Sequence, residues 1–568
     1  MEALKHLFFG VFGQRKRLCE TVKEESTKLE SHSGPLPVYI VPLSSNESPI
    51  NGCKHFSFGN DSTKHNRTIM VLGATGAGKS TLINGMINHI LGVEWDDSYR
   101  FKLIDEDQSK SQAHSQTSEV TVYKINHQDG FTVPFSLTIV DTPGFGDTRG
   151  IDKDKEIVEQ LRTLFSSDYG VNEIDAICFV AQASLARLTA TQKYVFDSVL
   201  SIFGKDVAEN IRILVTFADG QRPPVLEAIN ESGVPCPKNK DNLPLHFKFN
   251  NSALFAHNKS SAHNIAGDHD DDDDDDESED GGFEGMFWEM GTKSMKRFFA
   301  ALNLIQTKSL KLTKEVLKER QQLEVSVENL QVQVRLGLAK LEELKETREK
   351  LKEHEAEINR NKNFEFEVIV IRPYQEDISR TGHFITNCQQ CQVTCHYPCS
   401  RANDAEKYCC SAMGPNGYCK QCPGKCLWNV HFNQKYRWDH REVKEKRSVG
   451  ELQKKYQKAS GETITVKWLV GKLKVQYALV HNKVVALMEE SAKCLNRLKE
   501  IALKPNPLST PEYIEMLIEG EKNEGKPGWK QRVHALNSMK EKAELMVKVE
   551  KKEKILRSQL SVDDSHAN

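Results

Sequence analysis

Short apolar runs alternate with amphipathic stretches along the first half of the chain, from about residue 68. The apolar runs predict strands and the stretches between them predict helices. Strands that alternate with helices form a wound, mostly parallel sheet, so this half predicts an α/β domain. The predicted strands are 68–73, 119–126, 134–140, 174–181, 211–217 and 245–253. The predicted helices are 79–91, 153–166, 189–203, 222–231 and 286–301.

A different pattern occupies residues 308–362, which contain almost no Gly or Pro and are rich in Lys, Glu and Leu. Apolar positions recur there at alternating spacings of four and three, which predicts a long helix with a heptad seam. The seam consists of Leu323, Val327, Leu330, Val334, Gly337, Leu341, Leu344, Arg348 and Leu351. Its partner is either a second chain or another helix of the same chain.

Changes of pattern divide the chain into segments. The expected segments are a partly disordered leader (1–66), an α/β domain (67–305), a long helix or coiled coil (306–362), a strand and cysteine-rich module (363–440), a helical C-terminal region (441–560) and a tail (561–568). Within the leader, 37–43 is one extended piece, and the strand before the cysteines is 364–371. Lys- and Glu-rich helices are expected over 440–500 and 508–556, and we expect them to pack as a bundle beside the long helix.

Charge is distributed unevenly over the 568 residues. The net charge is −3, yet eleven acidic residues lie within 268–280, so the rest of the chain carries +8. Consecutive aspartates repel one another and bury nothing, which predicts a disordered acidic insertion over 258–283. Lysines of the C-terminal helices are interleaved with glutamates, which favours solvated helix faces over a nucleic-acid surface.

No apolar stretch approaches the roughly 18–20 residues that a membrane helix needs, so no transmembrane segment is predicted. The apolar run 7–13 is too short to span, and its flanking charges do not match a secretory signal. Nine of the 14 cysteines lie between Cys388 and Cys426. With no secretion signal, we expect a cytoplasmic, reducing setting, in which clustered cysteines indicate metal ligands before disulfides.

The most specific motif follows the first predicted strand. Its pattern GxxxxGKS, between a strand and a helix, is that of a P-loop. Gly residues let backbone N–H groups face phosphate oxygens, the lysine reaches the β- and γ-phosphates, and the serine hydroxyl is a Mg²⁺ ligand. The predicted nucleotide-binding residues of this loop are Gly73, Ala74, Thr75, Gly76, Ala77, Gly78, Lys79, Ser80 and Thr81.

A second motif, Asp-Thr-Pro-Gly, ends at Gly144 after the predicted strand 134–140. The strand delivers Asp141 to the Mg²⁺ site, directly or through water. Gly144 can present its N–H group to the γ-phosphate. Together the two motifs predict a nucleotide site with bound magnesium.

The two motifs make residues 66–305 resemble a P-loop GTPase of the translation-factor class, most similar to the septin, AIG1 and chloroplast-import-receptor branch. The segment 116–120 stands where that class has its switch I threonine, so the resemblance implies Thr117 as a further Mg²⁺ ligand, with Thr121 nearby. The resemblance implies GTP or GDP as the ligand and assembly into a homodimer or higher oligomer through the GTPase domain, the coiled coil or both.

The base-reading segment departs from the pattern of that class. The class has [NT]KxD, and Thr216 to Asp219 stand in its place, with Phe217 where the base-stacking lysine belongs. The resemblance implies that Asp219 accepts hydrogen bonds from guanine, together with Thr216 in the same motif. It also implies that Ser252 and Ala253 bring backbone N–H groups to the guanine oxygen.

A catalytic residue is missing from the sequence pattern. Small GTPases carry a glutamine after the DxxG motif, and Phe145 occupies that position. An apolar side chain cannot orient water, so we expect slow intrinsic hydrolysis, or hydrolysis completed by a group from a partner protomer. The catalytic residue itself stays unknown.

The cysteine-rich segment contains two CxxC pairs, each followed by another cysteine four residues on. Thiolates at this spacing converge on tetrahedral Zn²⁺, so one or two structural zinc ions are predicted, with no assignment of ligand to ion. One of the adjacent residues Cys409 and Cys410 is expected to be a bystander. The predicted ligands are Cys388, Cys391, Cys395, His396, Cys399, Cys410, Cys419, Cys422, Cys426 and His431.

Three functions compete on these observations. The first is a slow, dimerisation-dependent GTPase that acts as a switch or assembly regulator through its coiled coil and zinc module. The second is an oligomeric scaffold whose nucleotide is structural and rarely hydrolysed. The third is a RING-like ubiquitin ligase module, which is a weaker alternative because the cysteine spacing is irregular.

Overall fold

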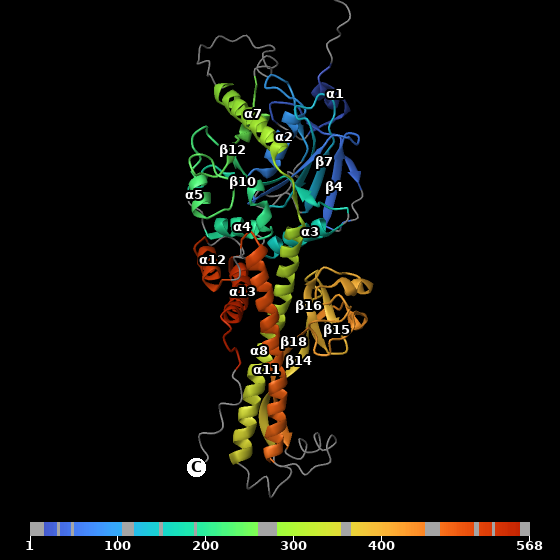
Figure 1. Ribbon diagram of the computed structural model, residues 1–568, viewed down its shortest axis with the longest axis vertical. Helices are drawn as coiled ribbons and strands as arrows, with labels where there is room; N and C mark the ends of the chain where they lie inside the picture. Colours follow the sequence, from blue (N-terminus) through green and yellow to red (C-terminus); the bar gives the residue numbers. More distant parts are fainter. Residues whose placement is uncertain are drawn as a thin grey trace, which may run out of the picture. The chain divides into compact units, whose positions relative to one another are not determined.

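The computed structural model describes residues 16–30, 34–46, 50, 52–104, 119–146, 151–167, 169–186, 190–258, 281–353, 365–448, 466–504, 510–524 and 529–556. The chain divides into two compact units (Figure 1). The first unit comprises 1–316, 501–507 and 515–536. The second comprises 317–500, 508–514 and 537–568.

An eight-stranded sheet forms the centre of the first unit, in the order β12-β11-β10-β5-β8-β7-β4-β3. The pairs from β12 to β8 and the pair β7–β4 are parallel, whereas β7–β8 and β3–β4 are antiparallel. The strands are β3 (Ser44–Asn46), β4 (Cys53–Phe58), β5 (Asn66–Gly73), β7 (Val120–Ile125), β8 (Ser136–Asp141), β10 (Ala176–Gln182), β11 (Ile211–Thr216) and β12 (His246–Lys248). The predicted α/β domain with a mostly parallel sheet is thereby confirmed.

Helices accompany this sheet, and apolar side chains fill the space between them. A large buried cluster includes Ile69 of β5, Leu82 of α2 and Phe298 of α7, all at most 1% exposed. The helices are α2 (Lys79–Ile90), α3 (Ile151–Ser166), α4 (Ala190–Leu200), α5 (Val225–Glu231) and α7 (Gly281–Leu304). The expected acidic insertion 258–283 was too long at both ends. Asn258 is buried, and α7 already begins at Gly281. Residues 259–280 lie outside the described part.

The predicted leader 1–66 differs most from the structure in this unit. Its described part contains α1 (Leu18–Glu25), and β1 (Thr27–Lys28) and β2 (Val38–Ile40) form a small sheet with β6 (Arg100–Lys102). Strand β4 extends the main sheet by pairing with β7. Short strands with mixed polarity are weak sequence signals, because pairing with distant strands stabilises them. Residues 1–15 lie outside the described part of the chain.

The first unit also takes in residues from far along the chain. Lys504 donates a hydrogen bond to Asp197 at 2.6 Å, and Leu503 donates its backbone N–H to the Phe203 carbonyl at 2.8 Å. Residues 501–507 and 515–536 are therefore part of this unit, whereas the sequence predicted one helical region over 441–560. The helices of that region are α11 (Val466–Ile501), α12 (Pro511–Glu524) and α13 (Trp529–Glu550).

Within the second unit, the heptad seam of α8 (Lys311–Glu353) packs on helices of the same chain. Leu330 and Val334 share a buried cluster with Val484 and Leu487 of α11, and α8 and α11 run side by side in Figure 1. At the weak seam position Gly337, an added Cβ would lie 2.5 Å from Leu556. The seam thus folds back on the chain in the described residues. The side chains of Arg348 and Leu351 and the residues 354–364 lie outside them.

The cysteine-rich segment lies between the two strands of a long ribbon. Strand β14 (Glu365–Asp377) pairs with β18 (Tyr436–Ser448) in antiparallel register. The expectation of helix from 440 was therefore wrong for 440–448, because pairing with β14 outweighs the helix preference of Lys and Glu. Between the two strands lie β15 (Phe384–Cys388), β16 (Val393–Cys399) and β17 (His431–Phe432), which form a three-stranded sheet.

None of the described helices combines the length and apolar character needed to cross a membrane.

Candidate nucleotide site and metal groups

The predicted P-loop lies between β5 and α2. Gly76 and Gly78 have φ values of +77° and +83°, a backbone region that other residues rarely adopt. A Cβ at Gly73 would lie 2.5 Å from the Val180 carbonyl oxygen of the neighbouring strand β10. Gly78 directly precedes α2, so the loop delivers backbone N–H groups at a helix N-terminus, where phosphate binds favourably.

Side chains from helix α2 and from strands β10 and β11 hold the shape of this loop. Lys79 is 8% exposed, and its Nζ donates to the carbonyls of Gly73 and Ala74 at 3.2 and 3.0 Å. Gln182 donates to the Gly76 carbonyl at 2.9 Å, and Thr216 donates to the Ala77 carbonyl at 2.7 Å. Thr216, predicted to bind nucleotide, is thus placed to support the loop. Gln182 was not predicted, and only its position at the end of the β10 run pointed to it.

The Asp-Thr-Pro-Gly segment docks on the same loop. Asp141 ends β8 and is 1% exposed. Thr75 donates its N–H to the Phe145 carbonyl, and Phe145 donates its N–H to the Gly73 carbonyl, both at 3.2 Å. A Cβ at Gly144 would lie 2.7 Å from the Thr75 nitrogen, so only glycine allows this close approach. The structure therefore brings the two predicted motifs together.

Phe145 is completely buried. Its ring is apolar and buried, so it offers no hydrogen bond that could orient a water molecule beside a bound phosphate. The sequence identified the apolar residue at the glutamine position, and the structure adds that its side chain is withdrawn from the site.

The predicted base-reading residues come from the ends of β11 and β12. Ala218 donates its N–H to the Phe249 carbonyl at 3.0 Å, and Asn250 donates to the Ala218 carbonyl at 3.1 Å, which joins the two loops. Asp219 and Ser252 are exposed, and Ala253 is 1% exposed.

Phe217 is unusual in both backbone and side chain. It has a φ of +52° and its ring is 57% exposed. Its ring atom Cε2 lies 3.5 Å from the point where a Cβ of Gly78 would be. An exposed aromatic ring in a strained backbone conformation, beside the P-loop, is typical of a functional site.

The switch I prediction, Thr117, lies outside the described residues, as do 105–118 as a whole. Thr121, its neighbour in the prediction, is buried in β7.

Comparisons with known proteins support the class of this domain. The sequence model of the septin family matches residues 64–169, which contain the P-loop and the Asp-Thr-Pro-Gly segment. No curated protein matches the chain. The P-loop and the sheet around it define an α/β P-loop domain, and this match makes residues 64–169 similar to septins.

Several solved structures resemble part of the chain. Toc33 from Arabidopsis thaliana in complex with Mg²⁺ and GMPPNP shares 16% identity, over 41% of this chain and 87% of that chain, with a TM-score of 0.24. Its complex with GDP and Mg²⁺ has the same identity and TM-score, over 41% and 85% of the two chains. A structure from work on dimerisation and GTPase activity of atToc33 and psToc159 shares 16% identity, over 44% and 86%, with a TM-score of 0.26. At these scores the similarity carries no argument about this chain.

The cysteine-rich region gathers all ten predicted zinc ligands into three groups whose ligand atoms lie within 4.8 Å of one another. The groups are Cys388, Cys391, Cys422 and Cys426; Cys395, Cys419, Cys422 and His431; and His396, Cys399 and Cys410. Cys422 belongs to two groups. Cys409 is exposed and belongs to none, which identifies it as the bystander of the adjacent pair.

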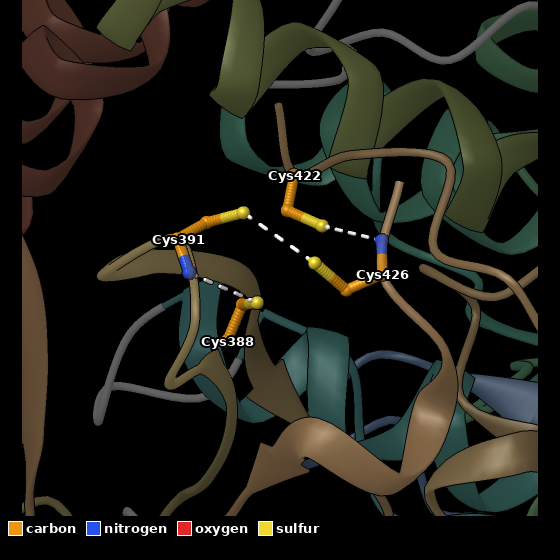
Figure 2. Close-up of side chains that lie close together, drawn as sticks. All are labelled: Cys388, Cys391, Cys422 and Cys426. Carbon is orange, nitrogen blue, oxygen red and sulfur yellow. Dashed lines mark hydrogen bonds between the residues drawn. The ribbon is translucent and has the colours of Figure 1, made fainter. Parts of the chain in front are cut away.

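The first group suits a metal of tetrahedral coordination. Its four sulfur atoms converge in Figure 2, where the sulfurs of Cys391 and Cys426 are 3.6 Å apart. Tetrahedral zinc with Zn–S distances of about 2.3 Å separates its sulfurs by about 3.8 Å. Gly424 borders the group, and a Cβ there would lie 2.9 and 3.0 Å from the sulfurs of Cys426 and Cys391.

The second group contains a histidine that is oriented for ligation. His431 is 1% exposed, and its Nδ1 donates to the Leu427 carbonyl at 2.9 Å. This bond leaves the lone pair on Nε2, a buried atom with no hydrogen-bond partner among the described residues. Metal-bound histidines commonly show this arrangement, in which the second ring nitrogen bonds to a carbonyl. The donor set and the orphaned nitrogen both fit zinc.

Backbone N–H groups point at the sulfurs, as thiolate ligands require. Cys391 and Cys426 donate their N–H groups to the sulfurs of Cys388 and Cys422, at 3.4 and 3.2 Å. Hydrogen bonding with Cys395 and Cys419 lowers the pKa of Cys422 well below its usual range. Hydrogen bonding with Cys410, together with His396, lowers the pKa of Cys399 to about 3 against the opposing effect of burial, and the same hydrogen bond raises the pKa of Cys410. The thiolate is the form that binds a metal.

Proposed function

We propose that this chain is a guanine-nucleotide-binding protein that hydrolyses GTP slowly and acts as a switch or assembly regulator. The observation that carries the proposal is the P-loop joined to the Asp-Thr-Pro-Gly segment through Thr75 and Phe145. A change at the γ-phosphate would act on both segments, because each holds the other in place. The septin match over 64–169 supports the same class.

The phosphates would be held by the backbone N–H groups of residues 73–81 and by Lys79. Magnesium would be held by the hydroxyls of Ser80 and Thr117 and by Asp141, and when bound it supplies positive charge to the β- and γ-phosphates. Gly144 would donate its N–H to the γ-phosphate.

For the base, we propose that Asp219 pairs with guanine while Ser252 and Ala253 approach its oxygen. Phe217 would take the role of the missing lysine and stack on the base. Its exposure, its place beside Gly78 and its positive φ all support this role. Stacking of a base on an aromatic ring contributes about 1–3 kcal/mol.

Hydrolysis would need a group from outside the described site, since Phe145 is buried. We propose that a second protomer supplies it, so that the active form is a homodimer or higher oligomer. An oligomeric scaffold with a structural nucleotide is the alternative, which the burial of Phe145 also supports.

One or two structural zinc ions, bound by the first two groups, would stabilise the cysteine-rich region, because the donor sets of these groups are those of closed zinc sites. Free thiols are required for this, which is why we propose a reducing, cytoplasmic setting. We favour this structural role over a ubiquitin-ligase role.

One experiment tests the base assignment: identification of the nucleotide that copurifies with the full-length chain, followed by GTP and ATP affinity measurements. We expect guanine nucleotide. Phe217→Ala should weaken its binding about 5- to 160-fold, the equivalent of losing about 1–3 kcal/mol of stacking. The matched control is Tyr169→Ala, since Tyr169 is an exposed aromatic residue (76%) of the same unit. Adenine nucleotide in the preparation, or equal effects of both variants, would refute the assignment.

A second measurement separates the switch from the scaffold. The rate of GTP hydrolysis per molecule should rise with protein concentration across the range in which the chain dimerises. A constant rate refutes trans-completion by a second protomer. Identical assembly size with GTP, GDP and no nucleotide would favour the scaffold.

A further inference from the structure

The third cysteine–histidine group differs from the other two in having three ligands, His396, Cys399 and Cys410. These residues are 6%, 4% and 4% exposed. The sulfurs of Cys399 and Cys410 are 3.8 Å apart, and His396 Nδ1 lies 3.3 Å from the Cys410 sulfur. The sulfur separation equals the roughly 3.8 Å expected for two thiolates on one tetrahedral zinc ion.

A hydroxyl oxygen lies close to these three ligands. Thr386 of β15 lies opposite His396 of β16 in the strand register. Its Oγ1 is 3.2 Å from the Cys399 sulfur and 3.3 Å from the Cys410 sulfur. The hydroxyl therefore lies within hydrogen-bond distance of both sulfurs, beside the three ligands that the group already provides.

Because the group is buried, water has little access to it, and a fourth ligand has to come from the protein. Thr386 is completely buried, and none of the other three residues exceeds 6% exposure. A closed structural zinc site has four protein ligands, whereas an open site leaves one position to water. A buried group of this kind therefore needs its fourth ligand from the protein.

The register of the sheet separates this group from the second one. Pairing passes from Thr386–His396 directly to Asn387–Thr394, so Cys395 is an extra residue at an irregularity in the ladder. Such bulges redirect side chains. The adjacent residues Cys395 and His396 consequently belong to different groups.

Donors also surround the thiolate of Cys399. Lys407 is completely buried, donates to the Ile385 and Arg401 carbonyls at 2.8 and 2.7 Å, and lies 3.9 Å from the Cys399 sulfur. The Arg401 N–H donates to the same sulfur at 3.4 Å. Hydrogen bonds of this kind around the ligands orient them and tune the metal site.

We propose that His396, Cys399, Cys410 and Thr386 bind a zinc ion of their own, with the Thr386 hydroxyl as fourth ligand. This site is additional to the zinc proposed for the first two groups and does not depend on the nucleotide proposal. With both of those groups filled through a shared Cys422 thiolate, the chain holds three ions.

Elemental analysis of the purified full-length chain tests the site, with Cys410→Ser as the variant and Cys409→Ser as its matched control. Cys409 is the exposed neighbour of Cys410 and belongs to no group. We expect Cys410→Ser to lose one zinc ion relative to the unmodified chain and Cys409→Ser to lose none. Equal zinc in Cys410→Ser and the unmodified chain overturns the site. Loss of every zinc ion from Cys410→Ser would overturn the claim that this site binds its ion independently of the first two groups.

The role of Thr386 is tested by Thr386→Val, which keeps the shape of the side chain and removes the oxygen. In a chelator titration, one ion should leave this variant at least tenfold faster than the unmodified chain. Release at the unmodified rate would show that Thr386 is not a ligand. If Cys410→Ser does not fold, this variant carries the test alone.

Thiol alkylation with mass mapping gives an independent result. Cys399 and Cys410 should be protected until zinc is removed, whereas Cys409 should react at once. A disulfide between Cys399 and Cys410 would overturn the proposal. Unmodified chain without zinc would overturn all three groups, whereas equal zinc in the unmodified chain and Cys410→Ser would overturn this site and leave the other two.

Discussion

The GTPase-like domain and the cysteine-rich region have buried cores of different chemistry. The domain buries branched and aromatic side chains such as Ile69, Leu82 and Phe298 between its sheet and its helices. The buried cluster of the cysteine-rich region contains Ala412 and Met413, and its other members are Cys388, Cys395, Cys399, Cys410, Cys419, Cys422 and Cys426. Apolar burial stabilises the first core, whereas we propose that bonds to a metal stabilise the second. One chain thus contains a region that folds by excluding water and another that we expect to fold by binding metal.

Metal removal should have the largest effect, and it should affect the two regions differently. Zinc contributes about 10–16 kcal/mol to the folding of small zinc domains, so a chelator should unfold residues 384–432. The domain should remain folded, because its apolar core holds no metal group among the described residues. Hydrogen exchange before and after metal removal measures both regions in one sample. Unchanged protection of 384–432 in metal-free protein would contradict the comparison.

The next largest effect is expected from removing a buried ion pair, which lies in the GTPase-like domain. Asp175 is 1% exposed and lies 2.6 Å from Arg67, and it also accepts hydrogen bonds from Thr68 and Thr307 at 2.7 Å. Asp175→Ala should cost about 3–5 kcal/mol of unfolding free energy, because Arg67 loses its carboxylate. Denaturant unfolding of the domain measures the change.

The control for that variant is Asp61→Ala. Asp61 also lies 2.8 Å from a lysine, Lys124, but its side chain is 89% exposed. Its loss should leave stability unchanged within error, since water screens exposed pairs. Equal effects of the two variants would show that burial is not the cause.

Acid should weaken the domain through one histidine. Burial, helped by Lys296, lowers the pKa of His89 from 6.5 to about 4. Protonation therefore favours the unfolded chain, so stability is complete above pH 6.5 and falls as the pH drops towards 4. The loss is on the order of 3 kcal/mol. His89→Gln should flatten this dependence, whereas His65→Gln, at an exposed position, should not. A slope unchanged in His89→Gln would exclude this cause.

The smallest expected effect comes from adding a single methyl group beside the first group of cysteines. Gly424→Ala would place a Cβ 2.9–3.0 Å from the sulfurs of Cys426 and Cys391, and should weaken zinc retention by about 1–2 kcal/mol. Gly471→Ala, at a helix position with nothing within 4 Å, is the control and should leave retention unchanged. Competition with a colorimetric chelator measures both. Equal retention in the two variants would mean that Gly424 does not limit the size of the first group.

Local patterns predicted much of the domain because they are physical properties of short segments. The run before the P-loop became β5 and the stretch after it became α2, since a buried strand and an amphipathic helix each have a period visible in sequence. The prediction of strand over 245–253 was too long. Strand β12 ends at Lys248, and Asn250 then accepts a hydrogen bond from the Ser252 N–H to begin a 3-10 turn.

Long-range contacts explain what sequence reasoning missed. Strand β18 has a helix-favouring composition, yet it pairs with β14 over its whole length. Thr386 carries no motif, and only the strand register places it opposite His396. Gln182 and Thr216 reach the P-loop because β10 lies beside β5, and β11 beside β10, in the sheet order.

By itself the sequence determined the chemistry that depends on spacing along the chain: a phosphate-binding loop with its lysine and serine, and a set of ten metal-type ligands. Tertiary structure decided how these residues are combined. It grouped the ligands in three sets, withdrew Phe145 into the interior and paired the α8 seam with α11 and α13 of the same chain. The reason is physical. Spacing along the chain sets which groups a turn can present, whereas burial and the choice of partners arise from contacts between residues far apart along the chain.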